Sequence, residues 1–370
     1  MMFDRRLVQY FDWGLLGLVA LLSGFGLITL YSAVTAGGAS PHHALYTKQF
    51  MWYGVGLVAM IFSFLVSYKT IEKWADVIYA GCNGLLLAVL IFGKLAGGSK
   101  RWLLLGPISI QPSEIAKVAV IIILARYYSK YASDRGMTWK GLVTPVAYVL
   151  VPVILIVNQP DLGTAMVIML IAATMTIFVK IERRTLIGIV VSGMVSVPLV
   201  WFFLKEYQQK RILTFLNPDR DPLGAGYHII QSKIAIGSGM IGGKGFLKGT
   251  QNALSFLPEQ HTDFIFSVLA EEWGFIGTTA LLLLFLFLIL WGLNIAYGCR
   301  DNFGTILSVG VTVLIAWQAL INIGMVMGLM PVVGVPLPFI SYGGSSIVTM
   351  MVCIGILMNV SMRRFLFEKG

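Results

Sequence analysis

The chain has 370 residues, of which 57% are hydrophobic and only 12% are charged. Soluble domains carry about 25% charged residues, so this composition excludes a water-soluble fold and indicates a membrane protein. The formal net charge of +10 does not call for a nucleic-acid partner, because the cytoplasmic loops of membrane proteins carry excess lysine and arginine. Cys82, Cys299 and Cys353 lie far apart in or beside apolar stretches, which predicts buried thiols rather than a metal site or disulfide framework.

Apolar stretches long enough to cross a bilayer recur along the chain. A helix needs about 20 residues to span the hydrocarbon core, and the sequence predicts an all-α polytopic membrane protein with about ten transmembrane helices. The first stretch follows a short basic segment, residues 1–6, and is too long for a cleaved signal, so we expect it to be retained. The predicted spans are residues 13–33, 51–68, 75–93, 112–128, 142–157, 164–180, 185–204, 264–292, 303–330 and 344–360.

The distribution of basic residues predicts the orientation of these helices. Ten crossings place both termini on one side, where the loops carry 15 lysines and arginines against 4 in the short loops opposite. The positive-inside rule therefore places the N and C termini in the cytoplasm. One large extracytoplasmic segment remains, residues 205–262. Because residues 227–236 within it have the pattern of a short amphipathic helix on the membrane surface, we expect a folded loop. Residues 1–370 are expected to form a single membrane domain.

Residues 111–117 place two charges at the start of a predicted span. Proline in the first turn, followed by Glu114, suits a helix N-terminus, where a carboxylate complements the helix dipole. Glu114 and Lys117 share one helix face, and Lys117 lies about 7–8 Å inside the helix at 1.5 Å per residue. A charge at that depth must be paired or face a wet cavity. A structural ion pair and a substrate-facing charge both remain open.

Two loop motifs on the outer side each allow a plain and a functional interpretation. In residues 158–164, Asp161 is a residue type that caps a following helix, and the alternative is a metal or substrate ligand. Residues 237–245 are rich in glycine but match the dinucleotide-binding and ATPase patterns poorly, since no strand precedes them. They predict either a tight turn or backbone amides that bind phosphate together with Lys244.

Residues 330–346 contain three prolines within eight residues, Pro331, Pro336 and Pro338, which forbid a continuous helix. An apolar, non-helical stretch at the outer edge of a membrane must be buried in protein or line a cavity. We therefore expect it to form a wall beside segment 205–262, although a stiff connector is compatible with the same pattern.

Asp263 is the most informative residue of the chain. It stands where a charged loop becomes a membrane-spanning helix, and an ionisable group at that boundary carries a desolvation cost. As a helix cap it would need no further role, but Thr262 is equally suited to that position. Beside a basic outer loop, the carboxylate can instead accept a proton from a substrate hydroxyl. Capping and catalysis both remain open from the residues alone.

Together these motifs resemble the SEDS family (shape, elongation, division and sporulation) over most of the chain. The similarity is carried by Lys100-Arg101-Trp102 and by residues 111–117, 158–164, 221–228, 231–249, 257–272 and 331–346. Residues 232–239 are most similar to the rod-shape branch, whereas Phe339-Ile340 is closer to the division and sporulation branches.

The resemblance implies a peptidoglycan glycosyltransferase of the bacterial cytoplasmic membrane that polymerises lipid II at the outer face during cell elongation. The implied partners are a class B penicillin-binding protein, which forms the cross-links, and other membrane proteins of the elongation complex, with lipid II and membrane lipid as ligands. A division or sporulation paralogue would share the chemistry. A flippase for the lipid-linked precursor and a scaffold that recruits a synthase are the alternatives from other classes.

The resemblance places the catalytic aspartate at Asp263. The expected reaction is inverting glycosyl transfer, in which Asp263 accepts the proton of the acceptor hydroxyl. A departing diphosphate needs cations nearby, with Mg or Mn, held by the diphosphate itself, as a further candidate. The expected substrate-binding residues are Glu114, Lys117, Asp161, Arg211, Lys233, Lys244 and Ser341.

Overall fold

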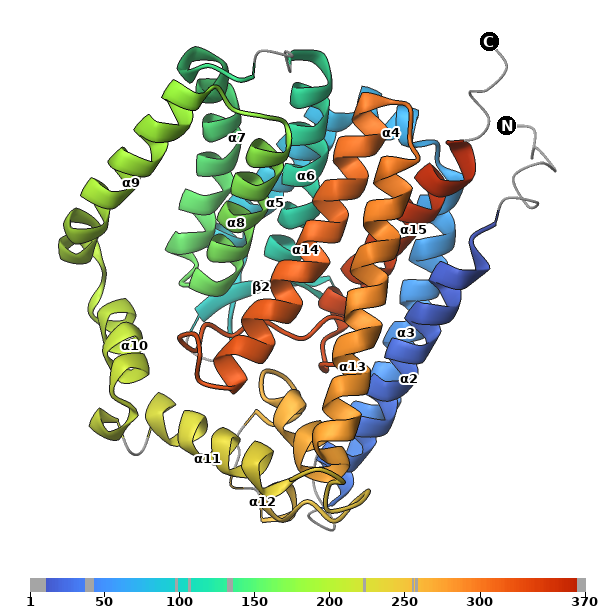
Figure 1. The fold of residues 1–370 in the computed structure, drawn as a ribbon, viewed down its shortest axis with the longest axis vertical. Coiled ribbons are helices and arrows are strands. Elements are labelled where there is room, and N and C mark those ends of the chain that lie inside the picture. Colours follow the sequence, from blue (N-terminus) through green and yellow to red (C-terminus); the bar gives the residue numbers. More distant parts are fainter. Residues whose placement is uncertain are drawn as a thin grey trace.

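The computed structural model describes residues 11–36, 43–96, 99–105, 108–131, 136–221, 224–254, 256 and 259–364, and these residues form a bundle of long helices (Figure 1). Every predicted span is helical. The corresponding helices are α2 (Trp13–Thr35), α3 (His43–Leu65), α5 (Ala75–Phe92), α6 (Pro112–Tyr131), α7 (Trp139–Asn158), α8 (Leu162–Phe178), α9 (Arg183–Phe203), α13 (Ile265–Tyr297), α14 (Asn302–Val326) and α15 (Gly344–Arg363).

Seven of these helices are long and apolar enough to cross a membrane, namely α2, α3, α5, α7, α13, α14 and α15. The polytopic all-α fold is therefore confirmed. That α6, α8 and α9 also cross the bilayer stays a prediction, as does the count of ten spans.

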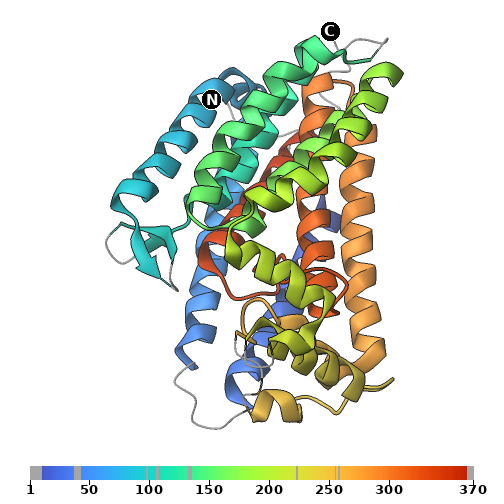
Figure 2. The ribbon, with the colours of Figure 1, turned by 90° about the vertical axis from the view of Figure 1, so that its left-hand side faces the viewer.

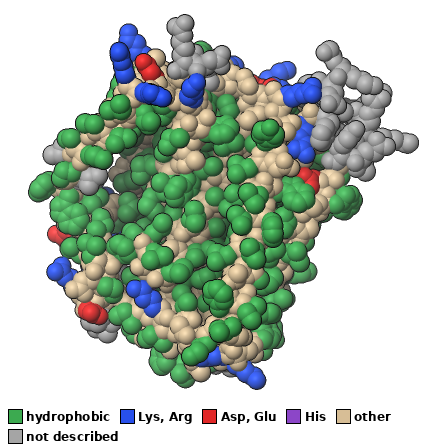
Figure 3. All heavy atoms as spheres, in the orientation of Figure 1, with side chains coloured by type: hydrophobic (Ala, Val, Ile, Leu, Met, Phe, Trp, Pro, Cys, Tyr) green, Lys and Arg blue, Asp and Glu red, His purple; other side chains and the backbone are tan. Residues whose placement is uncertain are grey.

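The start of α2 and the end of α15 lie at the same end of the bundle. Ser361 Oγ donates a hydrogen bond to Asp12 Oδ2 at 3.1 Å, and Asp12 also caps α2 by accepting from Leu15 N at 3.2 Å. The short helix α4 (Tyr68–Lys73) belongs to this end, and Lys and Arg side chains gather there (Figure 3). The positive-inside rule assigns this end to the cytoplasm. The basic residues 1–6 lie outside the described residues.

The centre of the bundle is formed by α6, α14 and α15, most of whose side chains are buried. The outer helices α2, α3, α5, α7 and α13 instead expose large apolar side chains along their length, as suits contact with lipid tails. Buried polar residues occur in the central helices, where Lys117, Gln318 and Asn322 are each exposed by 1% or less.

Two segments build the opposite, outer end. Between α5 and α6 lies a small antiparallel sheet of β1 (Lys94–Ala96), β2 (Ser99–Leu105) and β3 (Ile108–Ile110), in that order, which the sequence analysis did not predict (Figure 2). Segment 205–262 holds α10 (Glu206–Leu216), the 3-10 helix η1 (Pro218–Arg220), α11 (Ala225–Ser238) and α12 (Thr250–Ala253). This segment is folded, as expected, and runs across the end of the bundle from α9 to α13 (Figure 1).

The connection from α14 to α15 is not helical over residues 331–343, as the prolines predicted. Its apolar residues are largely buried, Val335 and Phe339 almost completely. Tyr342 N donates to His261 O at 2.9 Å, so the connection lies against the last part of segment 205–262. The predicted wall is therefore present.

Candidate active site

Asp263 lies in the turn of residues 259–264 that leads into α13. The N-cap of α13 is Phe264, which makes no side-chain capping hydrogen bond. Thr262 Oγ1 donates to Glu259 Oε2 at 2.9 Å instead of capping the helix. No described residue donates a hydrogen bond to the carboxylate of Asp263. Helix capping therefore does not account for Asp263.

The surroundings of Asp263 favour its protonated form. The pKa of Asp263 is raised from 3.8 to about 6, mainly by burial and secondly by the neighbouring Glu259. Arg211 and Arg101 lower this pKa, whereas Asp161 raises it. The side chain nevertheless keeps part of its surface accessible. A partly accessible carboxyl that titrates close to neutrality is suited to accept a proton. We call these five residues the Asp263 site.

Two guanidinium groups enter the Asp263 site from different segments. Arg211 comes from α10, and its pKa is lowered mainly by burial and then by the nearby Arg101. Its guanidinium carbon lies 6.0 Å from the centre of the Tyr207 ring. Like charges brought together in a partly buried place favour an anion between or beside them. The site therefore combines a proton acceptor with a preference for negative charge.

Arg101 comes from β2 and is held by the turn that follows α7. Its Nε donates to Gln159 O at 3.4 Å, and its Nη2 donates to Pro160 O. Its Nη1 lies 4.0 Å from Asp161 Oδ1. Arg101 was recognised from the sequence only as part of a motif, and it was not predicted to belong to the site. The Lys100-Arg101-Trp102 motif was the only sequence signal for this residue. The sheet that directs its side chain toward the site was not predicted.

Asp161 caps α8, as its residue type predicted, and is surrounded by donors. Its Oδ1 accepts from Thr164 N at 3.3 Å. Its Oδ2 accepts from Thr164 Oγ1 at 3.0 Å, Ser113 Oγ at 3.1 Å and Gln111 Nε2 at 3.2 Å. The motifs of residues 111–117 and 158–164 are thus in direct contact. These bonds favour a role for Asp161 in joining α6 to α8 and in orienting Arg101.

Glu114 and Lys117 form the predicted ion pair on one face of α6. Lys117 Nζ lies 2.7 Å from Glu114 Oε1, and the two side chains are exposed by only 1% and 4% respectively. Glu114 Oε2 has no partner among the described residues, and neither have the polar side-chain atoms of Gln318 on the adjacent α14. The pairing is therefore confirmed, and a contact of either charge with substrate stays a prediction.

Two buried side chains hold the turn that carries Asp263. Asn322 Nδ2, from α14, donates to Asp263 O at 2.9 Å and to Val335 O at 2.8 Å. Ser341 Oγ donates to Thr262 O at 2.7 Å and accepts a hydrogen bond from the backbone of its own connection. The Ser341 hydroxyl was predicted to contact substrate, but its proton is donated to the backbone of the turn. Asn322 was not predicted to belong to the site.

Gly334 keeps space free in front of the carboxylate. Its φ is +73°, a left-handed conformation that favours glycine. A Cβ built at this position would lie 3.3 Å from Asp263 Oδ2. The proline-rich wall therefore approaches Asp263 through a residue without a side chain.

The glycine-rich segment 237–245 bridges a break in α13. Gly274 has φ 61° and ψ −157°, so the helix is interrupted there, and backbone groups on both sides of an interruption need new partners. The segment provides them through Lys244 N to Glu271 O and Gly245 N to Glu272 O, both at 3.0 Å, and through Phe275 N to Met240 O at 2.8 Å and Ile276 N to Ile241 O at 3.2 Å. These bonds favour the tight turn over a phosphate-binding nest.

Lys244 and Lys233, the other two lysines predicted to bind substrate, have neighbours outside the Asp263 site. Lys244 Nζ donates to Glu271 Oε1 at 2.7 Å. Lys233 reaches the C-terminal end of α14, where a Cβ built on Gly328 would lie 2.8 Å from Lys233 Nζ. Neither lysine belongs to the charges that chiefly set the pKa of Asp263. A contact of either with substrate stays a prediction.

Comparison with known proteins relates this arrangement to enzymes of the cell envelope. The chain is 42% identical over 346 residues to peptidoglycan glycosyltransferase MrdB of Escherichia coli (strain K12), covering 93% of both chains. It is 41% identical over 350 residues to stage V sporulation protein E of Bacillus subtilis (strain 168), covering 92% of this chain and 94% of the relative.

Solved structures share the fold. One described as "Structural coordination of polymerization and crosslinking by a peptidoglycan synthase complex" has a TM-score of 0.82 at 31% identity, covering 96% of this chain and 98% of that one. Thermus thermophilus rod shape determining protein RodA has a TM-score of 0.70 at 27% identity, with the same coverage. Residues 13–365 match the FtsW/RodA/SpoVE family, described as cell cycle proteins. The expected SEDS membership is thus confirmed, and the chain belongs to the FtsW/RodA/SpoVE family.

Proposed function

We propose that this protein is a peptidoglycan glycosyltransferase that polymerises lipid II into glycan strands at the outer face of the bacterial cytoplasmic membrane during cell elongation. The E. coli relative is named a peptidoglycan glycosyltransferase. The observation that carries the proposal is the Asp263 site, where a carboxyl with a pKa raised to about 6 lies close to two arginines. The carboxyl supplies a base and the arginines supply charge for an anionic leaving group.

In the proposed reaction, Asp263 acts as general base. Its carboxylate takes the proton of the acceptor sugar's 4-hydroxyl while that oxygen attacks the anomeric carbon of the donor strand. The bond from that carbon to the polyprenyl diphosphate breaks from the opposite face, so the configuration inverts. The proton then passes from Asp263 to solvent, and the diphosphate leaves on its lipid. General base catalysis of this kind contributes about 10²- to 10⁴-fold to a rate.

Arg101 and Arg211 are the cations best placed to stabilise the leaving diphosphate. Negative charge grows on that group in the transition state, and fixed cations already oriented toward it lower the barrier. Both guanidinium groups lie within electrostatic range of Asp263. Arg101 is also anchored to the backbone by Gln159 and Pro160, so it needs little reorganisation during the reaction. Arg211 retains its expected role as a substrate-binding residue.

The lipid tails of both substrates remain in the bilayer while their headgroups react. Apolar side chains cover the exposed surface of α9, among them Ile187, Val191 and Met194. Figure 3 shows the molecule hollowed between α9 and the rest of the bundle. We propose that a polyprenyl tail lies along this hollow, with its diphosphate directed toward α10 and the Asp263 site.

A divalent cation remains a proposal tied to the substrate. The described residues contain no group of three or more His, Cys, Asp or Glu side chains arranged to hold a metal ion. Such an ion would therefore depend on the oxygens of the diphosphate, where it would add positive charge. Polymerisation assays with and without a chelator, followed by readdition of Mg or Mn, test this requirement.

The decisive experiment measures glycan polymerisation by the purified protein from lipid II. We expect Asp263→Asn to lower the initial rate at least about 100-fold. Asp219→Asn, a change of the same chemistry at an exposed position of the outer segment, is the matched control and should retain activity. Wild-type activity in the Asp263→Asn protein would refute the assignment of the base.

The same preparation in liposomes separates polymerisation from lipid transport. A flippase places its binding site near the bilayer midplane, whereas the Asp263 site lies at the outer end of the helices. The buried Glu114–Lys117 pair is the feature that would suit transport. Glycan length and headgroup translocation are therefore scored together, and translocation without glycan formation would favour the flippase.

A class B penicillin-binding protein is the proposed partner. A neighbouring fold was solved within a peptidoglycan synthase complex described as coordinating polymerization and crosslinking. Assays with and without the partner also test the scaffold alternative. A scaffold predicts that Asp263→Asn leaves the activity of the pair unchanged, whereas a polymerase predicts its loss.

A further inference from the structure

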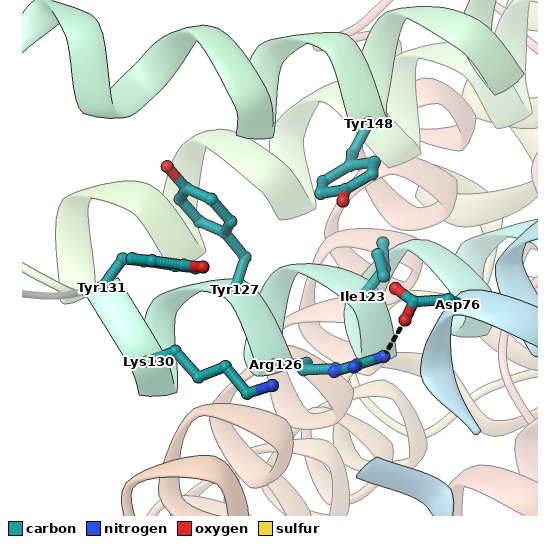
Figure 4. Close-up of a pocket in the computed structure, with 7 residues that line it drawn as sticks. All are labelled: Asp76, Ile123, Arg126, Tyr127, Lys130, Tyr131 and Tyr148. Carbon is teal, nitrogen blue, oxygen red and sulfur yellow. Dashed lines mark hydrogen bonds and ion pairs between the residues drawn. The ribbon is translucent and has the colours of Figure 1, made fainter. Parts of the chain in front are cut away.

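A polar pocket lies at the cytoplasmic end of the bundle, far from the Asp263 site. It is a partly open cavity of about 120 Å³ between α5, α6 and α7, smaller than a typical drug-sized site, so it suits a small polar headgroup rather than a whole ligand. Figure 4 shows its side chains converging on a shared opening. We call it the Arg126–Lys130 pocket, and its lining consists of Asp76, Ile123, Arg126, Tyr127, Lys130, Tyr131 and Tyr148.

The pocket carries net positive charge. Arg126 and Lys130 are four residues apart on α6 and therefore share one helix face. Arg126 forms an ion pair with Asp76 of α5, whose side chain is 63% exposed. No described residue is hydrogen bonded or ion paired to the ammonium of Lys130. Among the described residues, Lys130 thus has no counter-charge, and the partner of Arg126 is a carboxylate that is largely exposed to solvent.

The depth of the pocket matches the headgroup region of a bilayer. Lys130 is one residue from the end of α6, and Arg126 lies about 6 Å further in at 1.5 Å per residue. The rings of Tyr127 and Tyr131 pack with centroids 4.9 Å apart, and tyrosines are enriched at membrane–water interfaces. Basic pockets between helices on the cytoplasmic side are suited to lipid headgroups.

The surface beyond the pocket is apolar and faces the bilayer. Leu87 lies three turns along α5 on the same face as Asp76, and its side chain is 48% exposed. Val151, one turn beyond Tyr148 on α7, is 47% exposed. A ligand held here would therefore meet cations at its head and hydrocarbon surface below. A phosphate compound without acyl chains would make no contact with this apolar surface.

From this geometry we propose that the Arg126–Lys130 pocket binds the phosphate headgroup of an anionic phospholipid from the cytoplasmic leaflet, with the acyl chains along α5 and α7. The lipid would hold α5, α6 and α7 together at the end opposite to the Asp263 site. The proposal concerns a separate site and stands independently of the proposed activity.

Native mass spectrometry of the purified full-length protein tests the proposal by lipid titration. The probes are phosphatidylglycerol, phosphatidylcholine with the same acyl chains, and inorganic phosphate as competitor. We expect tighter binding of phosphatidylglycerol than of phosphatidylcholine, and about 30-fold weaker phosphatidylglycerol binding in Arg126→Gln/Lys130→Gln, since each basic residue near the surface contributes about fivefold. Arg183→Gln/Arg184→Gln removes two exposed charges from the start of α9 and should bind like the wild type.

Equal losses in the two double variants, or no loss in either, would overturn the proposal, and so would complete displacement of the lipid by inorganic phosphate. A further variant guards against misfolding as an explanation. Asp76→Asn removes the carboxylate that competes for Arg126 and should strengthen phosphatidylglycerol binding about fivefold. A misfolded protein does not gain affinity, so weaker binding by Asp76→Asn would also contradict the proposed site.

Discussion

Replacement of Asp263 by asparagine should stabilise the folded protein while it removes activity. The folded state raises the pKa of Asp263 from 3.8 to about 6, so it binds the proton more tightly than the unfolded chain does. At neutral pH the carboxyl is largely ionised in both states, and the folded state then carries the full cost of that ionisation. Asparagine has nearly the same shape and carries no charge, so the cost disappears.

The size of this effect follows from the pKa shift. A rise from 3.8 to about 6 corresponds to at most about 3 kcal/mol at 1.36 kcal/mol per pKa unit. Because Asp263 is partly accessible, screening by solvent reduces the expected gain to about 1–2 kcal/mol. The gain should shrink as the pH falls from 7 toward 4, since protonation of the wild-type carboxyl removes the same cost.

Thermal unfolding of the purified protein in detergent, followed by tryptophan fluorescence, measures this gain. We expect the melting temperature of Asp263→Asn to exceed that of the wild type by about 1–3 °C at neutral pH. Asp219→Asn serves as control and should not shift it. A less stable Asp263→Asn protein, or a gain that does not depend on pH, would refute the view that Asp263 is held in an unfavourable environment for the sake of chemistry.

Further predictions concern the groups around this carboxyl. The wild-type polymerisation rate should fall about tenfold per pH unit below pH 6, where the base is protonated; a flat profile between pH 5 and 8 would contradict this. Arg211→Gln removes a charge that lowers the pKa of Asp263, so the acid limb of the pH–rate profile should move to higher pH, whereas an unshifted limb would place Arg211 outside the site. Asn322→Leu leaves the carbonyls of Asp263 and Val335 without their donor and should cost about 1–3 kcal/mol of stability, measured as a lower melting temperature together with a lower kcat. Gly274→Ala places a side chain at a left-handed φ and should also lower the melting temperature by an amount equivalent to about 1–3 kcal/mol; an unchanged value would argue against a fixed break in α13.

The helical fold was predictable because a bilayer imposes simple requirements. A segment that crosses it must be about 20 apolar residues long and must satisfy its own backbone hydrogen bonds. All ten segments predicted from these requirements are helical. The sheet between α5 and α6 was missed because its strands are short and lie outside the hydrocarbon region, where composition constrains the backbone far less. The break in α13 at Gly274 was missed because it depends on a distant segment. Residues 237–245 supply the hydrogen bonds that the backbone loses at the break.

The site was predictable in part. Asp263 stood out because a carboxylate at a membrane boundary carries a cost that is visible from its position alone. Arg101 was overlooked because only the small sheet brings it to the turn after α7. Lys244 was expected near substrate, yet its ammonium contacts Glu271, a residue of α13 that the folded segment brings beside it. Charge can be counted along a chain, but its partners depend on how the loops fold.

The sequence by itself determined that the chain is a helical membrane protein, which end faces the cytoplasm, and which carboxylate is out of place, because these depend on the hydropathy and charge of consecutive residues. Only the tertiary structure decided that no described residue donates a hydrogen bond to the Asp263 carboxylate, that Arg101 and Arg211 are its neighbours, and that Asn322 and Ser341 hold its turn. Those properties depend on side chains from distant segments meeting in space. Electrostatic energies fall with distance between atoms, not with separation along the chain.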